Sequence, residues 1–116
     1  MHLTNIFVAL TTSLLLASSA QATYVLAVFQ DEDCVTPVAN QAETQVLSGT
    51  CDSNVKVGYK SIKVLHKWAS PAGTITFFER PYCTHNAHYH EASYHNLDKN
   101  KCYNLGFTVL AVGLAG

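Results

Sequence analysis

The chain has 116 residues, a formal net charge of −1 at pH 7 and a charged-residue content of 13%. Nucleic acid is bound by cationic surfaces that contact its phosphates, so this charge balance predicts no nucleic-acid partner. A chain of this length has room for one domain with a modest core.

The first segment of the chain resembles an export signal. An apolar run covers residues 6–17, and small residues follow it, ending in Ala20-Gln21-Ala22. The run is too short to cross a bilayer, which takes about 20 apolar residues. The small residues at positions 20 and 22 are of the kind that a signal peptidase reads. We therefore expect residues 1–22 to be a cleaved signal peptide and residues 23–116 to be a single secreted, extracellular domain.

Four cysteines lie beyond the predicted signal peptide: Cys34, Cys51, Cys83 and Cys102. An even number of cysteines in an exported chain is typical of structural disulfides rather than of thiol chemistry. We expect two disulfide bonds, and four cysteines allow three different pairings.

The region after the signal contains an internal repeat. Segment 26–30 (LAVFQ) precedes Cys34 by the same spacing as segment 75–79 (ITFFE) precedes Cys83. Each half continues with a polar loop, a second cysteine and a closing strand. The closing strands are expected at 61–64 and 108–111. By the symmetry of the repeat alone, we expect the disulfides to lie within the halves, as Cys34–Cys51 and Cys83–Cys102.

The segments of the repeat have the composition of β-strands. They are short, rich in β-branched and aromatic residues, and bounded by Gly, Pro, Asn and Asp. Ile75 and Phe77 alternate with threonines, which is the period of a half-buried strand. Two such units can bury their apolar faces against each other, which predicts an all-β sandwich of two Greek keys. We place the keys at about 23–68 and 73–116, joined by a linker at 69–73.

Two stretches resemble the βγ-crystallin Greek key. Residues 74–82 (TITFFERPY) are similar to the strand and hairpin that open such a key, and residues 61–64 (SIKV) to the stretch that closes one. The resemblance implies that Tyr82 packs as the hairpin aromatic. Cys34 and Cys83 stand near the position of the crystallin hairpin glycine. This variant is similar to small cysteine-rich secreted proteins of microbes and filamentous fungi, including crystallin-like killer toxins.

The calcium motif of the crystallin family is degraded in both halves. Calcium needs a set of hard oxygen ligands, usually including carboxylates. In the first half Lys56 and Val57 replace the acidic pair, and Lys60 replaces a hydroxyl. In the second half Asn104 alone remains, and Phe107 replaces a hydroxyl. We therefore expect no calcium binding.

A second candidate metal site is a histidine cluster in the second half. The segment 83–95 is dense in polar residues, whereas the matching loop of the first half contains no histidine. Neutral imidazoles favour Zn or Cu, and Glu91 is a further oxygen ligand within reach. The alternative is a solvated loop whose histidines make ordinary hydrogen bonds. The candidate ligands are His85, His88, His90 and His95.

The sequence lacks the motifs of common enzymes. It contains no Ser/His/Asp arrangement of known spacing, no Gly-rich phosphate loop and no His-Glu-x-x-His. A ribonuclease-like His and Glu pair also needs a cation for the phosphate, and Arg80 and the lysines are scattered along the chain. A small secreted hydrolase is therefore the less favoured class.

We expect a monomeric, non-enzymatic binding protein without a cofactor. The crystallin resemblance implies an effector or toxin-like protein that acts on a host or competitor cell. Its extracellular target, which is a cell wall, a membrane or a host protein, cannot be read from the sequence. The alternative is a secreted metal-binding protein that uses the histidine cluster, or a structural protein of the wall.

Overall fold

The computed structural model describes residues 22–53, 55, 57–68 and 74–115. The predicted signal peptide lies outside these residues, apart from Ala22, and so does the predicted linker at 69–73. Within the described part of the chain, no helix is long and apolar enough to cross a membrane.

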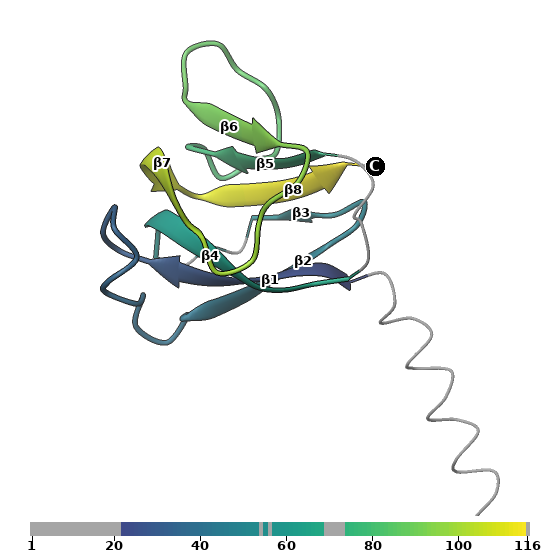
Figure 1. Ribbon diagram of the computed structural model, residues 1–116. Coiled ribbons are helices and arrows are strands. Elements are labelled where there is room, and N and C mark those ends of the chain that lie inside the picture. Colours follow the sequence, from purple (N-terminus) through teal and green to yellow (C-terminus); the bar gives the residue numbers. More distant parts are fainter. Residues whose placement is uncertain (1–21, 54, 56, 69–73, 116) are drawn as a thin grey trace, which may run out of the picture.

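The described residues form eight β-strands in two antiparallel sheets of four strands each (Figure 1). Sheet A has the order β2-β1-β4-β7 and sheet B the order β3-β8-β5-β6. The strands are β1 (Ala22–Phe29), β2 (Glu43–Leu47), β3 (Cys51–Asp52), β4 (Tyr59–Lys67), β5 (Thr74–Phe78), β6 (Glu91–Tyr94), β7 (Cys102–Val109) and β8 (Ala111–Ala115). The all-β prediction is confirmed.

Both sheets contribute to one hydrophobic core. Successive residues of a strand point to opposite faces, and in β1 every second residue from Tyr24 to Val28 is buried between the sheets. Burying an aliphatic or aromatic side chain of this size contributes about 1.5–3 kcal/mol each, so this shared core is the main stabilising feature. The core includes Tyr24, Leu26 and Val28 of β1, Ile62 and Val64 of β4, Ile75 and Phe77 of β5, and Val112 and Leu114 of β8.

The predicted closing strand of the second half was misplaced. Ala111 pairs with Phe78 in β8, just as Ser61 pairs with Phe29 in β4. The counterpart of Ser61 is therefore Ala111, three residues beyond the predicted Thr108. Residue 110 separates β7, in sheet A, from β8, in sheet B. No glycine or proline marks this change of sheet at residue 110, so the sequence pattern runs on as one strand.

The predicted disulfide pairing was wrong. The bonds are Cys34–Cys102 and Cys51–Cys83, with Cα–Cα distances of 6.0 and 5.8 Å. The physical reason is that the third strand of each half joins the other sheet. Cys51 of β3 pairs with Gly113 of β8, and a Cβ added to Gly113 would lie 3.1 Å from the Cys83 sulfur. Each bond therefore ties one half to the other, and two disulfides are typical of an oxidising, extracellular environment.

Candidate functional site

The connection between β5 and β6 forms a long loop that rises above sheet B in Figure 1. We call residues 79–91, which run from the end of β5 to the first residue of β6, the upper loop. Its two ends are joined by a hydrogen bond of 3.1 Å from the backbone amide of Glu79 to the carbonyl of His90. The Cys51–Cys83 disulfide fixes the middle of the upper loop to β3. The strands and the disulfide thus hold the loop while its side chains face solvent.

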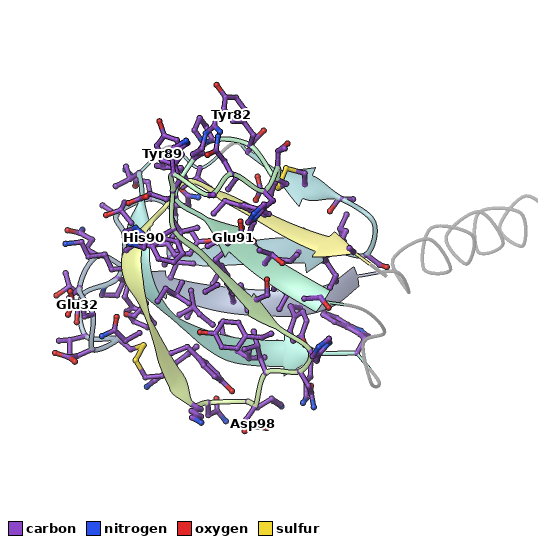
Figure 2. The ribbon with its side chains drawn as sticks, turned by 90° about the horizontal axis from the view of Figure 1, so that it is seen from above. Glu32, Tyr82, Tyr89, His90, Glu91 and Asp98 are labelled. Carbon is purple, nitrogen blue, oxygen red and sulfur yellow. A yellow bond between two sulfur atoms is a disulfide. The ribbon has the colours of Figure 1, made fainter. Side chains whose placement is uncertain are left out.

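The upper loop places one cation against two aromatic rings. The guanidinium carbon of Arg80 lies 4.7 Å from the ring centre of Tyr82 and 4.8 Å from that of Tyr89. Each such contact at an exposed site contributes about 0.5–1 kcal/mol. The two tyrosines are 52% and 49% exposed, and Figure 2 shows both at the upper margin of the molecule. The three residues form what we call the Arg–Tyr cluster.

Arg80 has its positive charge available for a ligand. It makes no ion pair or hydrogen bond with any residue that the structure describes. The two glutamates of the upper loop are paired with histidines instead. The His85 Nδ1 lies 2.6 Å from a carboxylate oxygen of Glu91, and the His90 Nδ1 lies 3.2 Å from one of Glu79.

Glu79 is held as a carboxylate by the backbone of the loop. Its Oε1 accepts a hydrogen bond of 3.0 Å from the backbone amide of His90. This bond is the largest cause that lowers the pKa of Glu79, and the His90 side chain lowers it further. The His90 ring also stacks on Phe107 of β7, with ring centres 5.9 Å apart. The base of the upper loop is therefore anchored by polar and aromatic contacts together.

The four predicted metal ligands are not gathered into one site. His85 and His90 face different glutamates, and the His95 Nδ1 lies 3.2 Å from the hydroxyl of Thr74. His88 is exposed, and its backbone amide donates to the Asn86 side chain at 2.9 Å. No three His, Cys, Asp or Glu side chains among the described residues are grouped to hold a metal ion. The Zn or Cu site stays a prediction without geometric support among the described residues; the side chains of His85, His90 and His95 each contact a different partner.

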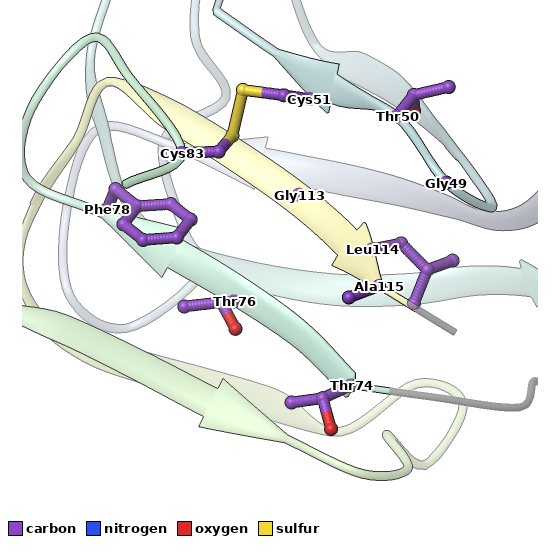
Figure 3. Close-up of a pocket in the computed structure, with 10 residues that line it drawn as sticks. All are labelled: Gly49, Thr50, Cys51, Thr74, Thr76, Phe78, Cys83, Gly113, Leu114 and Ala115. Carbon is purple, nitrogen blue, oxygen red and sulfur yellow. A yellow bond between two sulfur atoms is a disulfide. The ribbon is translucent and has the colours of Figure 1, made fainter. Parts of the chain in front are cut away.

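A shallow groove of about 360 Å³ lies on sheet B beside the Cys51–Cys83 disulfide (Figure 3). Thr74, Thr76 and Phe78 of β5 form one wall, and the Thr76 hydroxyl is engaged at 2.9 Å with that of Ser93. None of the groove-lining residues carries a free acid, base or thiol. The reactive groups that line the groove are threonine hydroxyls, and one of them, on Thr74, contacts the His95 ring at its edge.

Sequence reasoning missed the Arg–Tyr cluster. Arg80 was considered only as a phosphate-binding residue of an enzyme, and Tyr82 was expected to pack in the hairpin, whereas the structure leaves it half exposed. The adjacency of Arg80 and Tyr82 was a usable signal, because Arg80 is the only arginine of the chain. Tyr89 lies later in the same loop and meets Arg80 only because the loop folds back.

Comparison with known proteins leaves the function to be inferred from the chain itself. No protein-family model matches the sequence, and no curated protein or solved structure shows significant similarity to it.

Proposed function

We propose that the chain is a secreted, non-enzymatic binding protein that attaches to an extracellular target through the upper loop and acts as an effector or toxin-like protein. The observation that carries this proposal is the Arg–Tyr cluster, in which a cation that has no ion pair among the described residues lies against two half-exposed rings. Arginine and tyrosine are the residue types that dominate protein binding surfaces.

The proposal includes a two-Greek-key, crystallin-like architecture, and the strand order supports it. Each half contributes four strands, so β1 to β4 correspond in order to β5 to β8. Exchanging corresponding strands converts the sheet A order β2-β1-β4-β7 into β6-β5-β8-β3, which is the sheet B order read backwards. The disulfides obey the same exchange. Cys34 corresponds to Cys83 and Cys102 to Cys51, so each bond joins the hairpin loop of one half to the third strand of the other.

The two matching loops differ in a way that favours the upper loop as the binding surface. In the first loop, residues 30–42, the Asp31 carboxylate accepts three backbone amides, among them that of Thr36 at 2.7 Å. The buried Ser61 hydroxyl donates to the Asp31 carbonyl at 2.6 Å and accepts from the Cys34 amide at 3.0 Å. The first loop is thus held by its own polar groups.

The upper loop lacks this arrangement. Ala111 stands where the first half has Ser61, so no hydroxyl binds the upper loop from the closing strand. The upper loop instead carries the Arg–Tyr cluster and three histidines, His85, His88 and His90. The second copy lacks the structural hydroxyl and carries a partly exposed arginine with two exposed tyrosines, which suits it to binding.

The test is cell binding by the fluorescently labelled mature chain, residues 23–116. We expect the wild type to label the surface of sensitive cells, and the triple variant Arg80→Ala/Tyr82→Ala/Tyr89→Ala to lose at least about tenfold in binding. The matched control is Val35→Ala in the first loop, because Val35 is 72% exposed. Retention of full binding by the triple variant would contradict the proposal.

A further inference from the structure

We propose that the Arg–Tyr cluster is a binding site for the carboxylate of an acidic sugar, such as a uronic acid unit of an extracellular polysaccharide. This inference rests on the proposed function and names the class of ligand that the upper loop recognises.

The guanidinium of Arg80 is positioned for one planar anion. Its five N–H donors form a rigid fork that matches a carboxylate with two parallel hydrogen bonds. The rings of Tyr82 and Tyr89 contact the guanidinium and restrict its motion, while no described residue takes up its donors. Less conformational freedom is therefore lost when the anion binds.

The surroundings of Arg80 favour an isolated carboxylate over a dense polyanion. Two carboxylates, Glu79 at the base of the upper loop and Glu91 at the start of β6, lie near Arg80. A nucleic acid or a strongly anionic membrane would place several negative charges near these two carboxylates. Arg80 is the only arginine of the chain that could pair with them. A uronic acid unit needs only one guanidinium for its single carboxylate, and Arg80 supplies one.

The remaining groups at the site suit a sugar ring. The parts of the Tyr82 and Tyr89 rings that Arg80 leaves uncovered provide apolar surface for the C–H face of a pyranose, and their hydroxyls provide polar edges. Thr84 and Asn86 lie near Arg80 in the same loop, and Thr84 is exposed. The Thr84 hydroxyl and the Asn86 side-chain nitrogen have no hydrogen-bond partner among the described residues. These two groups are available to the hydroxyls of a sugar.

The experiment measures the affinity of the mature chain for polygalacturonate at neutral pH and low salt. We expect binding of polygalacturonate and none of its fully methyl-esterified form, which keeps the sugar rings and removes the charge. Arg80→Ala should weaken binding by at least about tenfold, because a charge-assisted pair is lost. Arg80→Lys, which keeps the charge without the fork, should recover only part of that loss.

Lys101→Ala is the matched control. The Lys101 ammonium lies 5.2 Å from the ring centre of Tyr103, so this variant also removes one cation from one tyrosine. We expect Lys101→Ala to bind polygalacturonate like the wild type. Equal losses in Lys101→Ala and Arg80→Ala, or equal binding of the esterified polymer, would overturn the inference.

Two further outcomes separate this inference from the proposed function. If polygalacturonate does not bind but the triple variant still loses cell binding, the upper loop is the binding surface and the sugar class is wrong. Binding to phosphatidylserine vesicles without binding to polygalacturonate would likewise replace the sugar by a membrane. If the triple variant also keeps full cell binding, both proposals fail together.

Discussion

Glu79 and His90 are joined at two points, because the same carboxylate oxygen lies 3.0 Å from the backbone nitrogen and 3.2 Å from the ring nitrogen of His90. The pair closes the base of the upper loop, where Glu79 follows β5 and His90 precedes β6. The ionised carboxylate is the stronger acceptor, so the His90 backbone amide, and after it the His90 ring, lower the pKa of Glu79 below the 4.5 of a free glutamate. The stability of this loop is therefore linked to pH.

The first prediction concerns Glu79→Gln. A carboxyl whose pKa is lowered on folding stabilises the fold above its unfolded-state pKa, and this contribution is lost as the pH falls through the folded-state pKa. We expect Glu79→Gln to have a lower Tm than the wild type at pH 7. The difference should shrink as the pH falls below about 4.5. Thermal unfolding at pH 7, 5 and 3 measures it, with the exposed Glu32→Gln as control. A difference that does not change with pH would count against the pair.

The second prediction concerns the disulfides. Non-reducing peptide mapping of the mature protein should recover Cys34–Cys102 and Cys51–Cys83. The bonds span 68 and 32 residues, so the chain-entropy model gives about 4 kcal/mol for each. Removing either pair by double alanine substitution should lower the free energy of unfolding by roughly that amount in urea titrations. Recovery of a Cys34–Cys51 peptide would show that the third strands do not cross between the halves.

The third prediction concerns Ser61→Ala. The Ser61 side chain is fully buried and holds both the Asp31 carbonyl and the Cys34 amide. Its removal leaves buried polar groups without partners and should destabilise the protein by about 1–3 kcal/mol. Ser93→Ala is the control, because Ser93 is exposed and shares one hydrogen bond with Thr76. We expect its effect to stay within about 0.5 kcal/mol. Similar losses in both variants would argue against a special role for Ser61.

The fourth prediction concerns Tyr59→Phe. Tyr59 is completely buried, and its hydroxyl has no hydrogen-bond partner in the described structure. Burial raises the pKa of this hydroxyl, and Asp52 raises it further. A buried hydroxyl without a partner costs about 1–3 kcal/mol. We therefore expect Tyr59→Phe to be as stable as the wild type or more stable by up to that amount, as measured by urea unfolding. A clear loss of stability would reveal a partner for the hydroxyl.

The strands were predictable because their pattern is local. Ile75 and Phe77 alternate with threonines, and the structure buries both residues completely. Which strands pair with one another could not be predicted from the local pattern. The crossing of β3 and β7 into opposite sheets depends on contacts between residues far apart in the sequence, such as Cys51 with Gly113. A repeat in the sequence is compatible with both disulfide patterns, so symmetry alone could not choose the right one.

The candidate site shows the same division between local and long-range information. The density of histidines at 85–95 was visible in the sequence, but the separate partners of His85, His90 and His95 were not. The Arg–Tyr cluster brings together residues from both ends of the upper loop. The cluster forms because β5 pairs with β6 and the Cys51–Cys83 disulfide anchors the loop. No short sequence motif indicates these contacts.

The most direct test of the upper loop as the binding surface is hydrogen–deuterium exchange of the mature protein. Exchange would be followed by mass spectrometry, with and without a wall fraction from cells that the wild type labels. We predict slower exchange in peptides that cover residues 79–91, and no change in the matching first loop at residues 30–42. Slower exchange confined to the first loop, or to the groove around Thr76 and Gly113, would contradict the account.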